Sequence, residues 1–189
     1  MTRNSISLRA AIALVIAAIG RPNISGAQST AMTVPAVRGT TLAGIPVVLP
    51  GSLKGKVGVL VVGFTRPSQT QVQAWGKRLA SDYIASSEVV YYEMPVLASA
   101  PSLARVTIEE GMKMSLSAAE RAHFLPLTQN EAGWLAVTHY VQGDDAYVLL
   151  IEGDGIVRWQ TRGAVTDANY AELKGKIGEM QAAMSAGAH

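Results

Sequence analysis

The chain has 189 residues, of which 49% are apolar and 16% charged, with a formal net charge of +2 and no cysteine. This length suits one globular domain whose core is large enough to fold without cross-links. The absence of cysteine excludes thiol-disulfide exchange and thiol-based peroxide reduction, because both reactions need a sulfur nucleophile.

The amino terminus has the pattern of a secretory signal peptide. A polar start with two arginines precedes an apolar run over residues 10–19, and the small residues Ser25 and Ala27 fit a cleavage site. The run is too short for a permanent transmembrane helix. We therefore expect residues 1–27 to be removed from a periplasmic or secreted protein. A mitochondrial presequence is the alternative, since the segment contains arginine and serine but no acidic residue.

Removal of this segment changes the charge balance. It contains Arg3, Arg9 and Arg21 but no Asp or Glu, so the remaining chain has 13 basic and 14 acidic residues. No Lys/Arg cluster interleaved with aromatic residues occurs in the sequence. We therefore expect no nucleic-acid partner. We also expect no cofactor, and a partner that is itself a protein.

Residues 28–43 are expected to form an extended lead-in to a domain covering residues 44–189. Residues 44–50 are typical of a short edge strand, because two prolines bar them from a sheet interior. Residues 57–64 form a continuous apolar run rich in valine, which predicts a central strand covered on both faces.

A helix is predicted to begin near Ser68, which forms the Ser-x-x-Gln pattern of a capping box with Gln71. Apolar residues then recur at helical spacing, at Val72, Trp75, Leu79 and Tyr83. Residues 88–96 predict the next strand. Residues 102–142 are expected to form a helical insertion, with a helix over 103–114 and a second capping box at Ser117 and Glu120. The pattern over residues 124–142 favours neither helix nor strand.

Residues 147–163 predict a β-hairpin, in which two strand-type runs flank the turn Gly153-Asp154-Gly155. Consecutive residues of the first run are apolar, so both faces of this strand need a covering layer, and we expect helices on both sides. A final helix is predicted to begin after Thr166. Its apolar positions are Tyr170, Leu173, Ile177, Met180 and Met184.

Residues 41–64, TLAGIPVVLPGSLKGKVGVLVVGF, resemble the entry to thioredoxin-like domains of the exported and peroxiredoxin-related kind. The resemblance implies an α/β thioredoxin-like fold, with a central mixed sheet, an N-terminal strand pair and helices on both faces. In that family the next loop carries Cys-x-x-Cys, but here it reads FTRPSQTQ. The family also has a cis-proline before the hairpin, where this chain has Gly143-Asp144-Asp145-Ala146.

The hairpin sequence resembles the mitochondrial ATP synthase assembly factor with a thioredoxin-like domain. The similarity is carried by Ile156-Val157-Arg158-Trp159 and by Gly163. It implies a role in recognition for the pair Arg158-Trp159. Because Arg158 and Trp159 are neighbours on a strand, we expect Trp159 in the core and Arg158 at the surface.

A family scaffold without its reactive groups favours binding over catalysis. We expect an exported, non-redox protein that holds a protein segment during folding or assembly of an envelope or membrane complex, with no catalytic residue and no metal ligand. The candidate binding residues are Arg66, Ser68, Gln71, Asp144, Asp145 and Arg158.

Two alternatives remain open. The first is a hydrolase or another non-thiol enzyme, in which Arg66, Ser68 and the Asp144-Asp145 loop face each other; Ser68 as a helix cap and the two aspartates as a turn are the simpler explanations. The second is a metal-binding protein. Two histidines and two methionines offer the soft ligands that copper prefers, although methionines of this spacing more often fill a core. These four residues are Met112, Met114, His123 and His139.

The first prediction concerns processing. Protein isolated from its natural host should begin at Gln28 or a few residues later, because the apolar run and the Ser25-Gly26-Ala27 site direct export and cleavage. Amino-terminal sequencing by mass spectrometry measures this directly. Recovery of a chain that retains residues 1–27, or its residence in the cytosol, would refute export.

Overall fold

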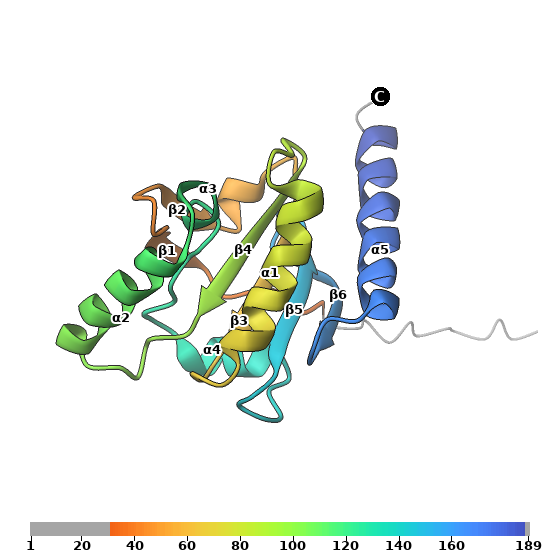
Figure 1. Cartoon of the computed structure of the whole chain (residues 1–189). Coiled ribbons are helices and arrows are strands. Elements are labelled where there is room, and N and C mark those ends of the chain that lie inside the picture. The colour runs from red at the N-terminus through yellow and green to blue at the C-terminus, as the bar shows by residue number, and fades with distance from the viewer. Residues whose placement is uncertain (1–30, 188–189) are drawn as a thin grey trace, which may run out of the picture. The chain divides into compact units, whose positions relative to one another are not determined.

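Four strands form the central sheet in the order β4-β3-β5-β6 (Figure 1). The computed structural model describes residues 31–187, so the predicted signal peptide lies outside the described residues. β3 (Val57–Gly63) pairs in parallel with β4 (Val89–Pro95) and antiparallel with β5 (Ala146–Ile151). β5 continues through the predicted turn into β6 (Val157–Arg162). The mixed sheet and its hairpin are therefore confirmed.

A separate two-stranded sheet precedes β3. Its strands are β1 (Val37–Thr40) and β2 (Pro46–Leu49), which pair antiparallel. The edge strand predicted over residues 44–50 is confirmed, but β1 lies within the segment expected to be an extended lead-in. The four residues of β1 have too little apolar alternation to predict a strand, and pairing with β2 makes them one. A 3-10 turn, Gly51–Leu53, follows and buries Leu53.

One face of the central sheet is covered by α1 (Gln69–Tyr83) and α5 (Asp167–Ala186), as Figure 1 shows. The predicted periodicity of both helices is confirmed, because the apolar positions are those that face the sheet. They are Val72, Trp75 and Leu79 on α1, and Tyr170, Leu173, Ile177 and Met180 on α5. The Thr166 hydroxyl caps α5 by accepting from the Asn169 N–H at 3.2 Å.

The opposite face is covered mainly by non-helical structure. The β1–β2 pair and residues 124–127 lie there, together with the short helix α4 (Glu131–Val137), which buries Trp134. Residues 124–127 run in parallel beside β4, through bridges from Glu93 to Phe124 and from Val96 to Leu127. The segment without a clear pattern is therefore an extended stretch followed by α4, and its form depends on β4 as a neighbour.

The predicted insertion also contains α2 (Ser102–Ser115) and α3 (Ala118–Arg121). The capping box at Ser117 and Glu120 is confirmed by reciprocal hydrogen bonds. α2 buries none of its residues and stands apart from the two helices on the sheet (Figure 1). Its outer side exposes Leu103 by 84% and Met114 by 83%. Among the described helices, none is long and apolar enough to cross a membrane.

Glu93 is an acidic residue in the core, on β4 and 5% exposed. Its carboxyl lies against Gly76 of α1, where a Cβ atom would overlap it. The carboxyl atom Oε2 has no hydrogen-bond partner among the described residues. Burial, and then the nearby charge of Glu120, raise the pKa of Glu93 to about 8. The core therefore contains a carboxyl that is neutral at pH 7.

The second prediction follows from this pKa. Between pH 4.5 and about 8 the folded state keeps a proton on Glu93 that the unfolded state has lost, so this group lowers stability as pH rises. The slope is at most about 1.4 kcal/mol per pH unit. Glu93→Gln should remove this slope and unfold at higher denaturant than the wild type at pH 8. Urea unfolding of both proteins from pH 5 to pH 9 measures it, and parallel curves would show that Glu93 is ionised in the fold.

Candidate functional site

The loop between β3 and α1 lies where the family that the sequence resembles carries its redox motif, and its centre is Ser68. This side chain is fully buried. Its hydroxyl donates to the Thr65 carbonyl at 2.7 Å and accepts from the Thr65 N–H at 3.3 Å. The Ser68 side chain makes no capping hydrogen bond to α1, so the predicted capping box is wrong. Ser68 instead hydrogen-bonds to Thr65 within the same loop.

Gln71, the other half of that predicted box, reaches across the sheet edge. Its side-chain oxygen accepts from the Ala146 N–H at 3.2 Å. The Thr65 hydroxyl donates to the Gly143 carbonyl at 2.8 Å. The loop before α1 and the loop before β5 therefore face each other, as expected. The Thr65–Gly143 hydrogen bond joins the two loops, and the Gln71–Ala146 hydrogen bond joins α1 to β5.

The loop before β5 is also held by hydrogen bonds to the side chain of Tyr147. Its hydroxyl accepts from the N–H groups of Val141 and Gln142, at 2.9 and 3.0 Å, and donates to the Gln142 carbonyl at 2.9 Å. The Tyr147 ring packs against Phe64 and Tyr140, with centroids 5.5 and 5.8 Å away. Both loops are thus held by contacts within the domain.

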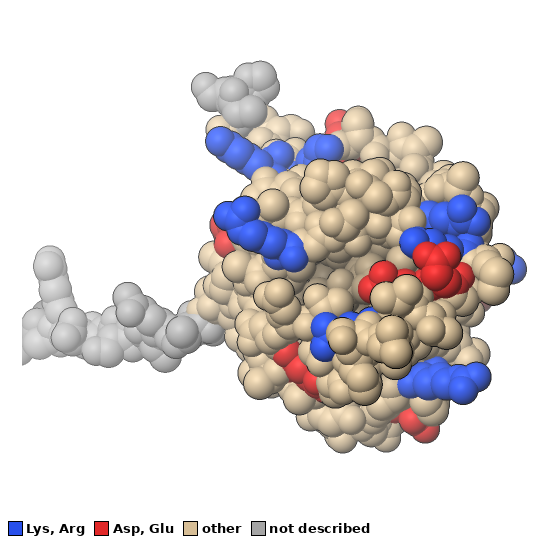
Figure 2. All heavy atoms as spheres, turned by 90° about the vertical axis from the view of Figure 1, so that its left-hand side faces the viewer, with Lys and Arg blue, Asp and Glu red and all other residues tan. Residues whose placement is uncertain are grey.

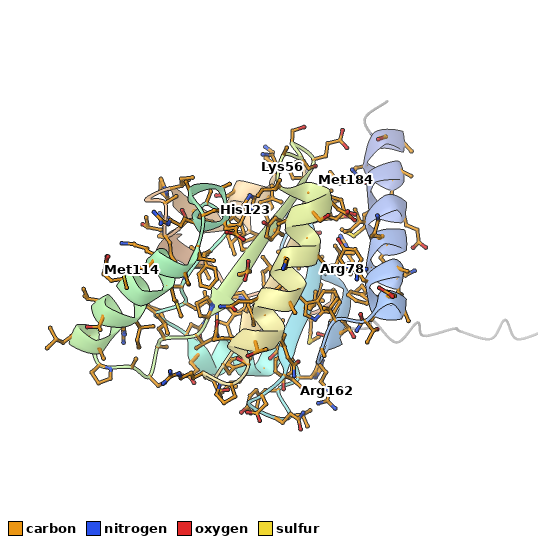
Figure 3. The ribbon with its side chains drawn as sticks, in the orientation of Figure 1. Lys56, Arg78, Met114, His123, Arg162 and Met184 are labelled. Atoms are coloured by element: carbon orange, nitrogen blue, oxygen red, sulfur yellow. The ribbon has the colours of Figure 1, made fainter. Side chains whose placement is uncertain are left out.

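The two aspartates of this loop do not act as a pair. Asp144 is exposed, whereas Asp145 is buried and accepts from Arg162 at 2.7 Å and from Gln142 at 2.9 Å. Figure 3 shows Arg162 at this end of the sheet. Asp145 therefore anchors the turn to β6, and the two carboxylates are not arranged as a pair for acid-base chemistry.

Arg158 lies on the hairpin, away from both loops. Its guanidinium pairs with Glu152 at 2.9 Å and with Asp154 at 2.7 Å, both within the same hairpin. Trp159 packs against the core beneath α5 and donates to Glu172 at 2.9 Å, so it is only partly buried. Arg158 is at the surface, as expected, but the structure does not bring it to the loops that carry the other candidates.

A groove of about 650 Å³ opens between α1 and α2. The loop and the first turns of α1 supply one wall with Thr65, Arg66, Gln69, Thr70 and Gln73. Of the six candidate binding residues predicted from the sequence, only Arg66 lines this groove. It is exposed and has no ion-pair partner within residues 31–187.

The opposite wall and the floor of the groove are mostly apolar. α2 contributes Ile108 and Met112, Leu116 follows at its end, and Leu97 and Phe124 lie below. Figure 2 shows the side of the molecule that carries α2, where uncharged side chains dominate and most charges lie toward the margin. The sequence did not predict this groove, because its walls come from two helices distant in the chain whose separation no local pattern encodes.

The metal-binding alternative gains no support from the described residues. His123 stacks on Tyr91 at 4.1 Å and places Nδ1 3.0 Å from the Tyr91 carbonyl, while His139 is exposed after α4. Figure 3 shows His123 beside β4 and Met114 out on α2. In the part of the chain that the structure describes, no three acidic, histidine or cysteine residues could hold a metal ion together.

The third prediction tests the role of Ser68. Ser68→Ala should cost about 1–3 kcal/mol, because it removes both hydrogen bonds to Thr65 in a buried site. Ser68→Asp should destabilise the protein further, since burial of a carboxylate is costly and this site lacks space for one; even a Cβ atom added to Gly63 would lie 2.7 Å from the Ser68 hydroxyl. Urea unfolding gives both values. An Asp variant as stable as the wild type would restore the capping interpretation.

No protein-family model matches this chain, and no curated protein matches it either. Solved structures do resemble it. A member of the Sco family of cytochrome c oxidase assembly proteins, BsSco, aligns over 81% of this chain and 95% of its own, with a TM-score of 0.55 and 17% identity. The thioredoxin domain of a thiol-disulfide oxidoreductase from Bacteroides vulgatus aligns over 79% and 98%, with a TM-score of 0.53 and 16% identity.

A third similar structure is the exposed lipoprotein thioredoxin of Streptococcus pneumoniae. It covers 74% of this chain and 98% of its own length, with a TM-score of 0.52 and 13% identity. Identities this low show the fold alone. The sheet order, the flanking helices and these structures together establish that the chain has the thioredoxin-like fold, built from a sequence without cysteine.

Proposed function

We propose that this protein binds an extended segment of another protein in the groove between α1 and α2, and that it serves in folding or assembly of an exported or membrane complex. The observation that carries the proposal is the groove itself. Its volume of about 650 Å³ is large enough for several side chains, and its lining is apolar or uncharged except at Arg66.

Charge defines one property of the bound segment. Arg66 is the one charged side chain among the groove-lining residues, and it has no acidic partner within residues 31–187. The amino-terminal end of α1 lies beside it and adds a partial positive charge. We infer that the segment carries an acidic side chain next to apolar ones.

The arrangement of α2 supports binding over catalysis. This helix buries none of its 14 residues, yet its inner side carries Ile108 and Met112 and its outer side Leu103 and Met114. Flexible methionine side chains adapt to varied apolar partners. Ser68, the nucleophile of the enzymatic alternative, is buried and hydrogen-bonded to Thr65. The exposed α2 and the buried Ser68 thus favour binding of a partner over catalysis.

A role in assembly draws support from one similar structure. BsSco belongs to a family of cytochrome c oxidase assembly proteins, so the fold occurs in a protein of that class. In the present chain such a role cannot use a thiol, because the sequence has none. Recognition would depend on the groove and on Arg66.

The fourth prediction tests Arg66 with two fluorescent ten-residue peptides of alternating Leu and Ser, one with a central Asp and the other with a central Lys. The wild type should prefer the Asp peptide. Arg66→Glu should bind that peptide about tenfold more weakly, equivalent to about 1.4 kcal/mol, and should reverse the preference. Its melting temperature should stay within about two degrees, because Arg66 is exposed and unpaired in the described residues.

Arg38→Glu is the matched control, since Arg38 is an exposed arginine on β1 and does not line the groove. It should bind both peptides as the wild type does. Fluorescence anisotropy measures the affinities, and envelope proteins captured by each variant provide the corresponding comparison with native partners. If Arg66→Glu keeps the wild-type preference, the acidic segment binds elsewhere.

A further inference from the structure

Glu93 is connected to the floor of the groove through its backbone. Its N–H donates to the His123 carbonyl at 2.8 Å, and its carbonyl accepts from the Leu125 N–H at 2.8 Å. The residue between these two partners is Phe124, which lies in the groove floor. Phe124 is therefore held beside β4 at the position of Glu93.

The carboxyl of Glu93 is in contact with the other groove wall. It lies so close to Gly76 of α1 that a residue with a side chain would not fit at position 76. Gln73 lies one helical turn earlier on the same side of α1 and lines the groove. The space that Glu93 occupies thus sets how closely α1 approaches β4 and Phe124.

The surroundings of this carboxyl do not compensate a negative charge. Tyr91 from β4 places a hydroxyl nearby that has no partner among the described residues, and Glu120 from α3 adds a like charge. His123 stacks on Tyr91, while Lys77 of α1 acts on Glu120. β3 presents apolar side chains to this layer. Within residues 31–187, an ionised Glu93 would therefore have neither a paired cation nor a complete set of hydrogen bonds.

We propose that ionisation of Glu93 opens the groove, by forcing α1 away from β4 and Phe124 until water reaches the carboxylate. This inference rests on the proposed function, because it concerns regulation of the same groove. The protonated carboxyl permits the close packing against Gly76 that the structure shows. A buried carboxylate without a partner is costly, and separation of the two elements relieves that cost. The bound segment is then released as pH rises, because its contacts with α1 and Phe124 can no longer form together.

The experiment uses the absence of native cysteine. Gln73→Cys and Met114→Cys place two unique spin labels on exposed positions of α1 and α2. Electron-electron resonance distances are measured from pH 6 to pH 10, without any peptide. In the wild-type background the distance distribution should change with a midpoint near pH 8, where the pKa of Glu93 lies. In the Glu93→Gln background it should stay constant.

Two control variants test whether Glu93, and not a neighbouring group, causes the change in label distance. Glu88→Gln removes an exposed carboxylate just before β4 and should leave the transition unchanged. His123→Gln removes the neighbouring imidazole and should do the same. If Glu93→Gln does not fold, Glu93→Met supplies a neutral side chain of similar length for the same comparison. A wild type without a distance change, or a change that persists in the neutral variants, overturns the proposal.

Peptide affinity separates this proposal from the proposed function. The Asp peptide should bind the wild type several-fold more weakly at pH 9 than at pH 7, and Glu93→Gln equally well at both. If the peptide binds but the label distances stay constant from pH 6 to pH 10, the proposed opening of the groove is wrong and the proposed binding function stands. A distance change without peptide binding at any pH would overturn the binding function and keep the conformational response.

Discussion

The burial of β3 on both of its faces is the constraint on which the rest of the structure depends. All seven residues of this strand are buried, and its neighbours β4 and β5 are also almost entirely buried. Two different layers must therefore cover the sheet. α1 and α5 supply one, and the strand pair, residues 124–127 and α4 supply the other. The loop after β3 must then emerge between β4 and β5, which determines where the site lies.

The loop at that position contains no cysteine and borders the groove between α1 and α2. Ser68, Thr65 and Gly143 form a continuous set of hydrogen bonds that joins the two facing loops. The groove therefore has one wall that begins at these hydrogen-bonded loops and a second wall formed by α2, which buries none of its residues. Function in this fold resides in such local features and not in the scaffold, which the similar structures share at 13–17% identity.

Glu93 is a buried acidic residue in a strand whose other residues are uncharged. Most buried polar groups have hydrogen-bond partners, and this carboxyl has one oxygen without any among the described residues. Features of this kind are more often associated with function than with stability. Its side chain lies against Gly76 of α1, and its backbone pairs with the two residues that flank Phe124 of the groove floor, so Glu93 contacts both elements. The sequence signal was present, since Glu93 is the sole charged residue in the strand VVYYEMP.

The sequence by itself determined the elements whose causes are local. The hairpin turn, the apolar stripes of α1 and α5, and the caps at Ser117 and Thr166 depend on residues a few positions apart, so their patterns predicted them. Tertiary structure decided the partners of groups that have more than one choice. Ser68 and Gln71 have capping-box spacing, yet their side chains bond to Thr65 and Ala146. The form of residues 124–142, the isolation of α2 and the burial of Glu93 against Gly76 were decided in the same way, because each depends on a segment distant in sequence that only the folded chain brings near.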